Sequence, residues 1–346
     1  MSTQFETHTT DWRSVIKKNQ MRSRLIIVTY LLIYALIGLL FDTYIQLGHY
    51  PGATAGQIVQ ALVSFQILPI CTLIAFAIAV VCIFVTYLSY DKLMLMGTEY
   101  FEITPETARN LKEKQIYNVV EEMKIAAGLQ YMPRVFLIEA DYMNAFASGF
   151  SEKSAMIAIT RGLAEKLDRS ELQAVLAHEL SHIRHLDIKL TLFASVLSNL
   201  ILMMIDILFW SALFGGNRGR GGGRDRNQLF ILIMVLRYLL PLITVLLSLY
   251  LSRTREFMAD SGCVELMRDN EPLARALTKI EDDHKANAGQ YQADYKKTAH
   301  EGVRRAAYIY DPASAGIAPD SSFSDLFSTH PKTAERLKAI GIKIKS

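Results

Sequence analysis

Four long apolar runs interrupt an otherwise mixed chain, and the first two contain no charge. These two extend over about 25–41 and 67–88 and hold no Asp, Glu, Lys or Arg. A helix needs roughly 17–25 largely apolar residues to cross the hydrocarbon core of a bilayer. Both runs therefore predict transmembrane helices rather than helices buried in a globular core.

The other two apolar runs, about 190–214 and 229–251, each contain one ionisable residue. These residues are Asp206 and Arg237, and each is costly in an apolar helix unless it faces a partner or a cavity. The two can pair with one another. The pattern predicts a hydrophobic helical hairpin that either spans the bilayer or is partly embedded against a neighbouring domain.

Basic residues beside the apolar runs indicate the orientation of the chain. Segment 42–66 holds no Lys or Arg, whereas five basic residues precede the first run: Arg13, Lys17, Lys18, Arg22 and Arg24. Because Lys and Arg gather on the cytoplasmic side, the N-terminus and the region from about residue 91 are expected there. The loop 215–228 does not fit this orientation, because a hairpin that spans the bilayer would place the loop's four arginines on the outer side.

The predicted organisation alternates membrane and soluble parts. A cytoplasmic N-terminal segment, 1–24, leads into two transmembrane helices within 25–90. A folded domain follows in two parts, 91–189 and 252–346, and the hairpin at 190–251 separates them.

Short apolar runs bounded by turn-forming residues predict three strands in the soluble part, at 135–138, 144–149 and 155–160. Helical periodicity covers 119–128, and the polar stretch 168–171 is typical of a helix start, with Asp168 or Ser170 as the cap. The expected fold class is therefore an α+β membrane protein, mainly helical, with a small β-sheet.

Composition excludes two classes of protein. Hydrophobic residues make up 51% of the chain, charged residues 21%, and the net charge is only +3. No basic stripe with interleaved aromatics is present, so nucleic acid is not an expected partner. The three cysteines, Cys71, Cys82 and Cys263, have no spacing typical of a disulfide framework or a cysteine metal site, which favours a reducing compartment.

The candidate chemistry begins with the motif His178-Glu179-Leu180-Ser181-His182. Residues four apart on a helix share a face, so His178 and His182 can present two imidazole nitrogens to one zinc ion. Glu179 then lies where it can act as the general base of a metalloprotease. His185 is a weaker third candidate and is expected to be exposed or to support a ligand.

A third protein ligand is expected after the hairpin. Glu256 and Asp260 lie one helical turn apart, so both can face the histidine pair. Glu256 would complete a His₂Glu zinc site, and Asp260 would accept the free ring N–H of one ligand histidine. The alternative is an exposed ladder of ion pairs formed with Arg253 and Arg255.

Several motifs together resemble the HtpX family of membrane metalloproteases, which are gluzincins. They are HELSH at 178–182, SRTREFMAD at 252–260, NAFASG at 144–149, STHP at 328–331 and ERL at 335–337. The resemblance covers nearly the whole chain. Ser148 departs from it mildly, because threonine is expected there. The resemblance implies a zincin-type catalytic domain that holds one zinc ion.

The resemblance also implies roles for further residues. Asn144, Ala145, Phe146 and Ala147 would form an exposed edge strand on which an extended substrate adds as another strand. An ordinary core strand is the alternative. His330 or Arg336 would stabilise the oxyanion of the tetrahedral intermediate; a structural role near the C-terminal helix is the alternative.

The function implied is a zinc endopeptidase of a bacterial inner (cytoplasmic) membrane, multi-pass, with its catalytic domain in the cytoplasm. Its expected substrates are misfolded or damaged membrane proteins, cut as part of a stress response. The resemblance also implies an ATP-dependent membrane protease as a partner. Two rival functions stay open: a CAAX-type protease for prenylated peptides, and a non-catalytic membrane scaffold stabilised by zinc.

Overall fold

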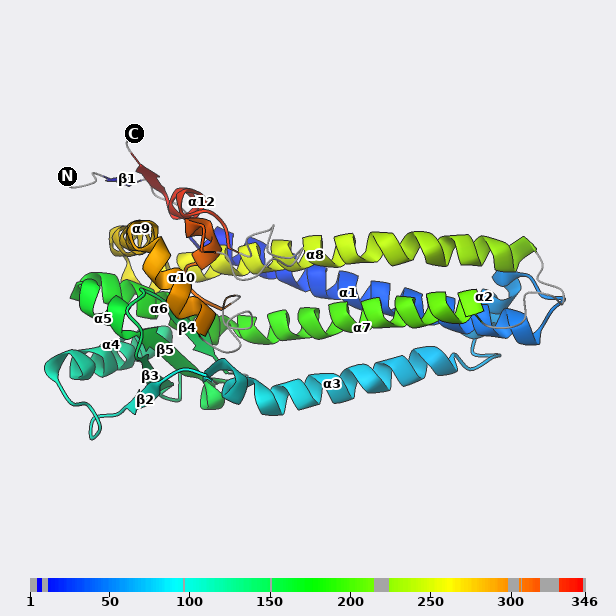
Figure 1. Ribbon diagram of the computed structural model, residues 1–346, viewed down its shortest axis with the longest axis horizontal. Coiled ribbons are helices and arrows are strands. Elements are labelled where there is room, and N and C mark those ends of the chain that lie inside the picture. The colour runs from blue at the N-terminus through cyan, green and yellow to red at the C-terminus, as the bar shows by residue number, and fades with distance from the viewer. Residues whose placement is uncertain are drawn as a thin grey trace. The chain divides into compact units, whose positions relative to one another are not determined.

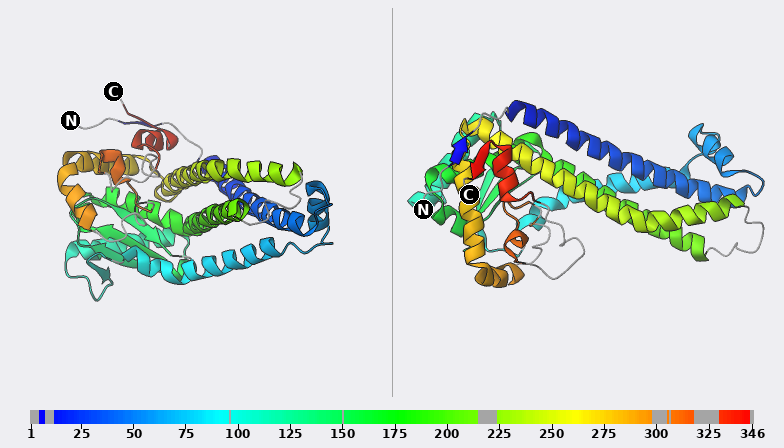
Figure 2. Two further views of the ribbon diagram at one scale, coloured as in Figure 1. Left: turned by 45° about the vertical axis from the view of Figure 1, so that its right-hand side comes forward. Right: turned by 90° about the horizontal axis from the view of Figure 1, so that it is seen from above.

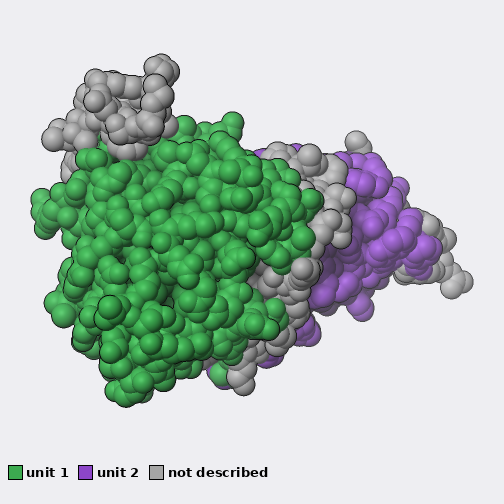
Figure 3. Space-filling view, turned by 60° about the vertical axis from the view of Figure 1, so that its left-hand side comes forward, with its two compact units in different colours: residues 1–23, 88–190, 249–346 green, residues 24–87, 191–248 purple. Residues whose placement is uncertain are grey.

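A computed structural model describes residues 5–7, 12–95, 97–149, 151–214, 224–297, 305, 307–317 and 330–344. Ser328 and Thr329 and most of the loop 215–228 lie outside the described residues. The chain divides into two compact units, coloured separately in Figure 3. Unit 1 comprises 1–23, 88–190 and 249–346, and unit 2 comprises 24–87 and 191–248.

Unit 2 is a helical bundle, in which stretches of α1, α7 and α8 run side by side (Figures 1 and 2). Its helices are α1 (Trp12–His49), α2 (Ala55–Val63), α3 (Ile70–Leu95), α7 (Asp187–Phe214) and α8 (Arg224–Met267). Three of the described helices are long and apolar enough to cross a membrane: Arg13–His49, Asp187–Phe214 and Asp225–Met267. The apolar part of α3, Ile70–Thr86, is shorter, so its spanning stays a prediction.

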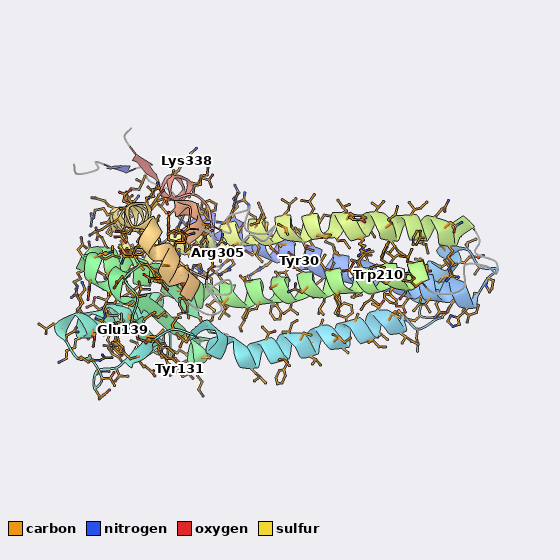
Figure 4. All side chains as sticks on the ribbon, in the orientation of Figure 1. Tyr30, Tyr131, Glu139, Trp210, Arg305 and Lys338 are labelled. Atoms are coloured by element: carbon orange, nitrogen blue, oxygen red, sulfur yellow. The ribbon has the colours of Figure 1, made fainter. Side chains whose placement is uncertain are left out.

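Buried polar contacts connect the helices of unit 2. The carboxylate of Asp42 on α1 accepts hydrogen bonds from the backbone N–H groups of Cys71 and Thr72, at 2.8 and 2.9 Å, and so caps α3. Tyr30, labelled in Figure 4, donates to the carbonyl of Thr244 at 2.8 Å. Such partners satisfy polar groups that neither lipid nor an apolar core can satisfy.

The two ionisable residues of the hairpin form a pair. The Arg237 Nε lies 2.9 Å from the Asp206 Oδ1, which confirms that each charge faces the other within the bundle. Pairing lowers the cost of holding both charges in an apolar segment.

Unit 1 contains a mixed four-stranded sheet in the order β2-β3-β5-β4. Its strands are β2 (Tyr100–Ile103), β3 (Arg134–Ile138), β4 (Ala145–Ser148) and β5 (Met156–Thr160). The pair β3/β5 is parallel, and the pairs β2/β3 and β4/β5 are antiparallel. The last three strands coincide with the predicted ones, whereas β2 was not predicted. A second, two-stranded sheet joins β1 (Phe5–Thr7) to β6 (Ile342–Ile344).

Unit 1 also contains several shorter helices. They are α4 (Leu111–Ala127), α5 (Arg161–Lys166), α6 (Arg169–His185), α9 (Glu271–Ala286), α10 (Ala288–Lys297) and α12 (Thr333–Ala339), with 3₁₀ turns at Glu152–Ser154 and Pro312–Ala315. Helix α6 packs against α4, α9 and β4, and so lies in the core. Asp168 caps its start and forms a capping box with Glu171.

The expected exposed edge strand is covered in this structure. Strand β4 does end the sheet, but all four of its residues are buried. Phe146 forms an antiparallel bridge with Tyr308, and the backbone N–H of Ile309 donates to the Ala145 carbonyl at 2.9 Å. The chain itself therefore pairs with part of this edge, because unpaired backbone groups next to a core are costly.

Candidate metal centre and active site

Three buried side chains converge from helices α6 and α8. The Nε2 atoms of His178 and His182 lie 3.2 Å apart. The Glu256 Oε2 lies 3.6 Å from the His178 Nε2, and the Glu256 Oε1 lies 3.6 Å from the His182 Nε2. Tetrahedral zinc with ligands at about 2.0–2.1 Å would separate its ligand atoms by about 3.3–3.4 Å. The donor set and its spacing therefore fit one zinc ion.

The third ligand candidate, Glu256, follows the hairpin in the sequence. Helix α8 continues beyond its apolar part through Met267, so Glu256 is carried into unit 1. Both Glu256 and Asp260 are buried, at 3% and 0% exposure, and Arg255 is buried too. These residues therefore do not form the exposed ladder of ion pairs that was the alternative.

Each histidine has its own carboxylate on the second ring nitrogen. The His178 Nδ1 lies 3.0 Å from the Asp260 Oδ1, and the His182 Nδ1 lies 2.9 Å from the Asp187 Oδ2. These contacts direct both Nε2 atoms to the shared point and set the tautomers. Asp187 was not predicted from sequence. Helix α6 ends at His185, and its C-cap residue Leu186 adopts the left-handed conformation (φ 53°), a turn that brings Asp187 back towards His182.

Arg336 on α12 supports the same arrangement. Its guanidinium donates to both Asp260 oxygens, at 2.9 and 2.6 Å, and to the Ile309 carbonyl at 2.6 Å. A bidentate contact of this kind holds the carboxylate rigidly. Arg336 also lies 3.6 Å from the Glu256 carboxylate. Its contacts favour positioning of Asp260, and through it His178, over the oxyanion contact expected from the resemblance.

Glu179 is buried beside the metal ligands with unused hydrogen-bonding capacity. Within the described part of the chain, neither carboxylate oxygen accepts a hydrogen bond of normal geometry. Burial raises the pKa of Glu179 to about 7. The neighbouring Glu256 charge adds to the rise, while the charges of His178 and Arg336 and the backbone amide of Ala147 oppose it. A carboxylate tuned close to neutral pH is suited to accept and return a proton.

The two histidines titrate differently. Burial lowers the pKa of His178, but hydrogen bonds to Asp260 and Glu256 more than offset this and bring the pKa to about 9. Burial lowers the pKa of His182, and the contact with Asp187 opposes that effect only in part. His178 therefore holds the proton that a metal ion would have to displace.

His330 also reaches the centre, whereas His185 does not. The His330 Nδ1 lies 3.4 Å from the Glu256 Oε2, so this side chain borders the site. The His185 Nδ1 lies 3.2 Å from the Ser181 Oγ, which makes it a neighbour of the motif and no ligand. Of the predicted substrate residues, Asn144 donates from its amide to the Tyr310 carbonyl at 3.0 Å and holds the covering segment.

A glycine permits the two ligand helices to approach. A Cβ built on Gly262 would lie 1.9 Å from the Ser181 Oγ, which no real side chain tolerates. Helices α6 and α8 therefore approach closely here, two residues beyond the SRTREFMAD motif on α8. No sequence pattern indicated this contact.

Comparison with known proteins is consistent with this geometry. The pattern of Peptidase family M48 matches residues 110–342. A Protease HtpX homolog of Helicobacter pylori (strain Shi470) is 39% identical over 335 residues, which cover 97% of this chain and 99% of that protein. A Protease HtpX homolog of Campylobacter hominis is 34% identical over 265 residues, covering 77% and 86%.

Among solved structures, a crystal structure of S. mikatae Ste24p aligns with a TM-score of 0.46 and 17% identity, over 97% of this chain and 67% of that one. The family pattern spans strands β3, β4 and β5, helices α6 and α8, and α12, and the Helicobacter pylori relative matches nearly from end to end. This chain therefore belongs to peptidase family M48 and, within it, to the HtpX proteases.

Proposed function

We propose that this membrane metalloprotease is a zinc-dependent endopeptidase that cuts misfolded or damaged membrane proteins on the cytoplasmic side of a bacterial inner membrane. One observation carries the proposal: His178, His182 and Glu256 converge at metal-ligand spacing beside a buried Glu179, whose carboxylate has no hydrogen bond of normal geometry among the described residues. A site that only stabilises the fold needs no such carboxylate, which argues against the scaffold alternative.

Each residue of the site has a proposed role in peptide hydrolysis. When bound, zinc supplies Lewis acidity that polarises a carbonyl and lowers the pKa of water. Glu179 takes the proton of the attacking water and later gives it to the leaving amine. His330 lies at the border of the site and is our candidate for stabilising the oxyanion. Asp260, Asp187 and Arg336 hold the ligand histidines in orientation.

The substrate is proposed to add to β4 on the Ala147 side of the bridge between Phe146 and Tyr308. The amide of Ala147 lies near Glu179, so a strand paired there would bring its peptide bond to the base. Accessible cytosolic loops and ends of damaged membrane proteins suit such pairing, because extended segments are what an edge strand binds. An ATP-dependent membrane protease stays part of the proposal as a partner, on the family resemblance alone. Because the sequence contains no GxxxxGK phosphate loop, cleavage by this chain is itself proposed to be independent of ATP.

A single preparation tests the proposal. The full-length protein is purified in detergent, its metal is measured, and casein and a prenylated peptide are offered with and without chelator. We expect about one zinc per chain and chelator-sensitive casein cleavage. Cleavage of the prenylated peptide alone would favour the CAAX-type alternative, and no cleavage of either by the zinc-loaded protein would favour the scaffold.

A further inference from the structure

The exposed face of helix α7 in unit 2 differs from the exposed faces of two neighbouring apolar helices. On α1 between residues 25 and 45, and on α3 between residues 73 and 85, every exposed residue is apolar, as contact with lipid requires. On α7 four of the exposed residues are polar. They are Ser195, Asn199, Asp206 and Ser211.

The polar residues of α7 belong to one stripe along the helix. Successive spacings of three or four residues place five exposed side chains on one side of α7, and we call them the α7 outer face: Ser195, Asn199, Met203, Asp206 and Trp210. The buried residues of α7 between 191 and 214 are all apolar. A membrane helix that faced only lipid would have the reverse arrangement.

These polar groups lie deep in a helix that is long and apolar enough to cross a membrane. Asn199 lies twelve residues after Asp187 and fifteen before Phe214, so it is at least about 18 Å from either end of α7. Neither the Asn199 carboxamide nor the Ser195 hydroxyl forms a hydrogen bond with any residue that the structure describes. Because hydrocarbon offers no hydrogen bonds, such groups require a polar partner.

The pair of Asp206 and Arg237 presents charges of both signs at the same face. The Asp206 side chain is 53% exposed and the Arg237 side chain 25%. The Arg237 guanidinium lies over the rings of Phe209 and Trp210, 4.1 and 5.1 Å from their centroids, and Trp210 is labelled in Figure 4. Its Nε binds Asp206, while its Nη groups have no hydrogen bond in the described part of the chain. The pair can therefore both donate and accept further hydrogen bonds.

We propose that the α7 outer face binds the same face of a second copy of this chain within the membrane. Two copies related by a two-fold axis along the membrane normal place equal residues at equal depth. A carboxamide both donates and accepts, so Asn199 can hydrogen-bond to its counterpart. Each pair of Asp206 and Arg237 likewise meets a pair that carries both signs.

A membrane segment of a substrate could also supply polar groups, but only while it is bound. A face that waited for a substrate would leave its polar groups bare for most of the time, which is costly in hydrocarbon. This cost favours a constant partner, the second copy. The inference goes beyond the proposed function and does not depend on it, because the α7 outer face contains no proposed metal ligand or base.

Cysteine cross-linking tests which face forms the contact. The full-length protein, with its three native cysteines replaced by Ser, is placed in phosphatidylcholine vesicles and oxidised. Met203→Cys on the α7 outer face is compared with Val81→Cys, an exposed position on α3. Because a disulfide needs Cα atoms within about 7 Å, we expect linked dimer from Met203→Cys and only background from Val81→Cys. Equal yields would contradict the proposed interface.

Energy transfer between donor-labelled and acceptor-labelled copies in the same vesicles measures the strength of association. Asn199→Leu should weaken association about tenfold, since hydrogen bonds between membrane helices are lost. Asn199→Gln keeps the carboxamide and should restore most of the association. The matched control, Val81→Leu on α3, should leave it unchanged. Zinc content is measured in each variant, so that a misfolded protein is recognised by its lost metal.

Three further results would overturn the proposal. A monomer at every ratio of protein to lipid would exclude the second copy, and so would association that Asn199→Leu leaves intact. Labelling of Ser195→Cys by a membrane-impermeant maleimide would mean that water, and not protein, contacts the face. A labelled single-span peptide with a central Asn is offered as well, and its binding to monomeric protein through Asn199 would assign the face to a substrate segment.

Discussion

At the scale of single residues, Glu179 combines burial with an environment that leaves its carboxylate free for a proton. Replacement by Gln keeps the volume and removes the base. We expect Glu179→Gln to retain zinc and to lower the turnover number for casein by about 10²–10⁴-fold, the usual range for a general base. Metal analysis beside a digest measures both. Full activity in the zinc-loaded variant would refute the role.

Asp187 is the residue whose importance only the structure revealed. It accepts the ring N–H of His182 at 2.9 Å and is fully buried. Asp187→Asn should weaken zinc binding by about 10–100-fold, the usual effect of losing a carboxylate behind a ligand histidine. Zinc competition against a chromophoric chelator measures the affinity. Unchanged affinity would mean that His182 is oriented by packing alone.

Zinc affinity should depend on pH through His178. Its raised pKa of about 9 means that the metal-free site holds a proton on this ring at neutral pH, and zinc must displace it. Affinity is therefore expected to fall about tenfold for each unit between pH 8 and pH 6, and to rise as the pH approaches 9. Titrations at several pH values in one buffer series check the slope. A flat profile would contradict the raised pKa.

At the scale of elements, the contact between α6 and α8 sets the spacing of the ligands. Gly262→Ala would drive a methyl group into Ser181, and overpacking of this kind costs about 1–3 kcal/mol. We expect a lower thermal midpoint in detergent and weaker zinc binding.

The control for this variant is Gly289→Ala on α10. No atom lies within 4 Å of a Cβ at that position. Alanine favours a helix by about 1 kcal/mol over glycine, so the control should be neutral or stabilising. If both variants lowered the midpoint equally, the close contact at Gly262 would not be the cause.

At the scale of the whole molecule, the distribution of charge and the position of the apolar helices predict sidedness. The N-terminal segment and unit 1 are expected in the cytoplasm, and the loop 215–228 on the other side if α7 and α8 fully cross. The sidedness can be measured with single cysteines, placed at Thr107 or at Asn217 in a variant whose three native cysteines are replaced by Ser. Membrane-impermeant maleimide should label position 217 in intact cells and position 107 only after lysis. Labelling of neither in intact cells would mean a partly embedded hairpin.

Local sequence patterns were enough to predict the apolar helices, three of the strands and the helix cap at Asp168. The signals for these features lie within a few residues: length and purity of an apolar run, turn formers beside a short run, and an acidic residue before a helix. Strand β2 escaped prediction because its residues, Tyr100–Ile103, show no clean alternation and depend on pairing with β3 for their conformation.

The convergence of His178, His182 and Glu256 could be predicted from the sequence, whereas most of the contacts that hold these side chains in place could not. The spacing of His178 and His182 follows from helix geometry, and Glu256 was expected because it lies one helical turn from Asp260 after the hairpin. Which carboxylate supports which histidine depends on contacts between distant segments: Asp187 turns back after the left-handed Leu186, and Arg336 arrives from the C-terminal helix. The covering of β4 by Tyr308 arises in the same way, because side-chain patterns report local periodicity and only the folded chain brings remote residues within bonding distance.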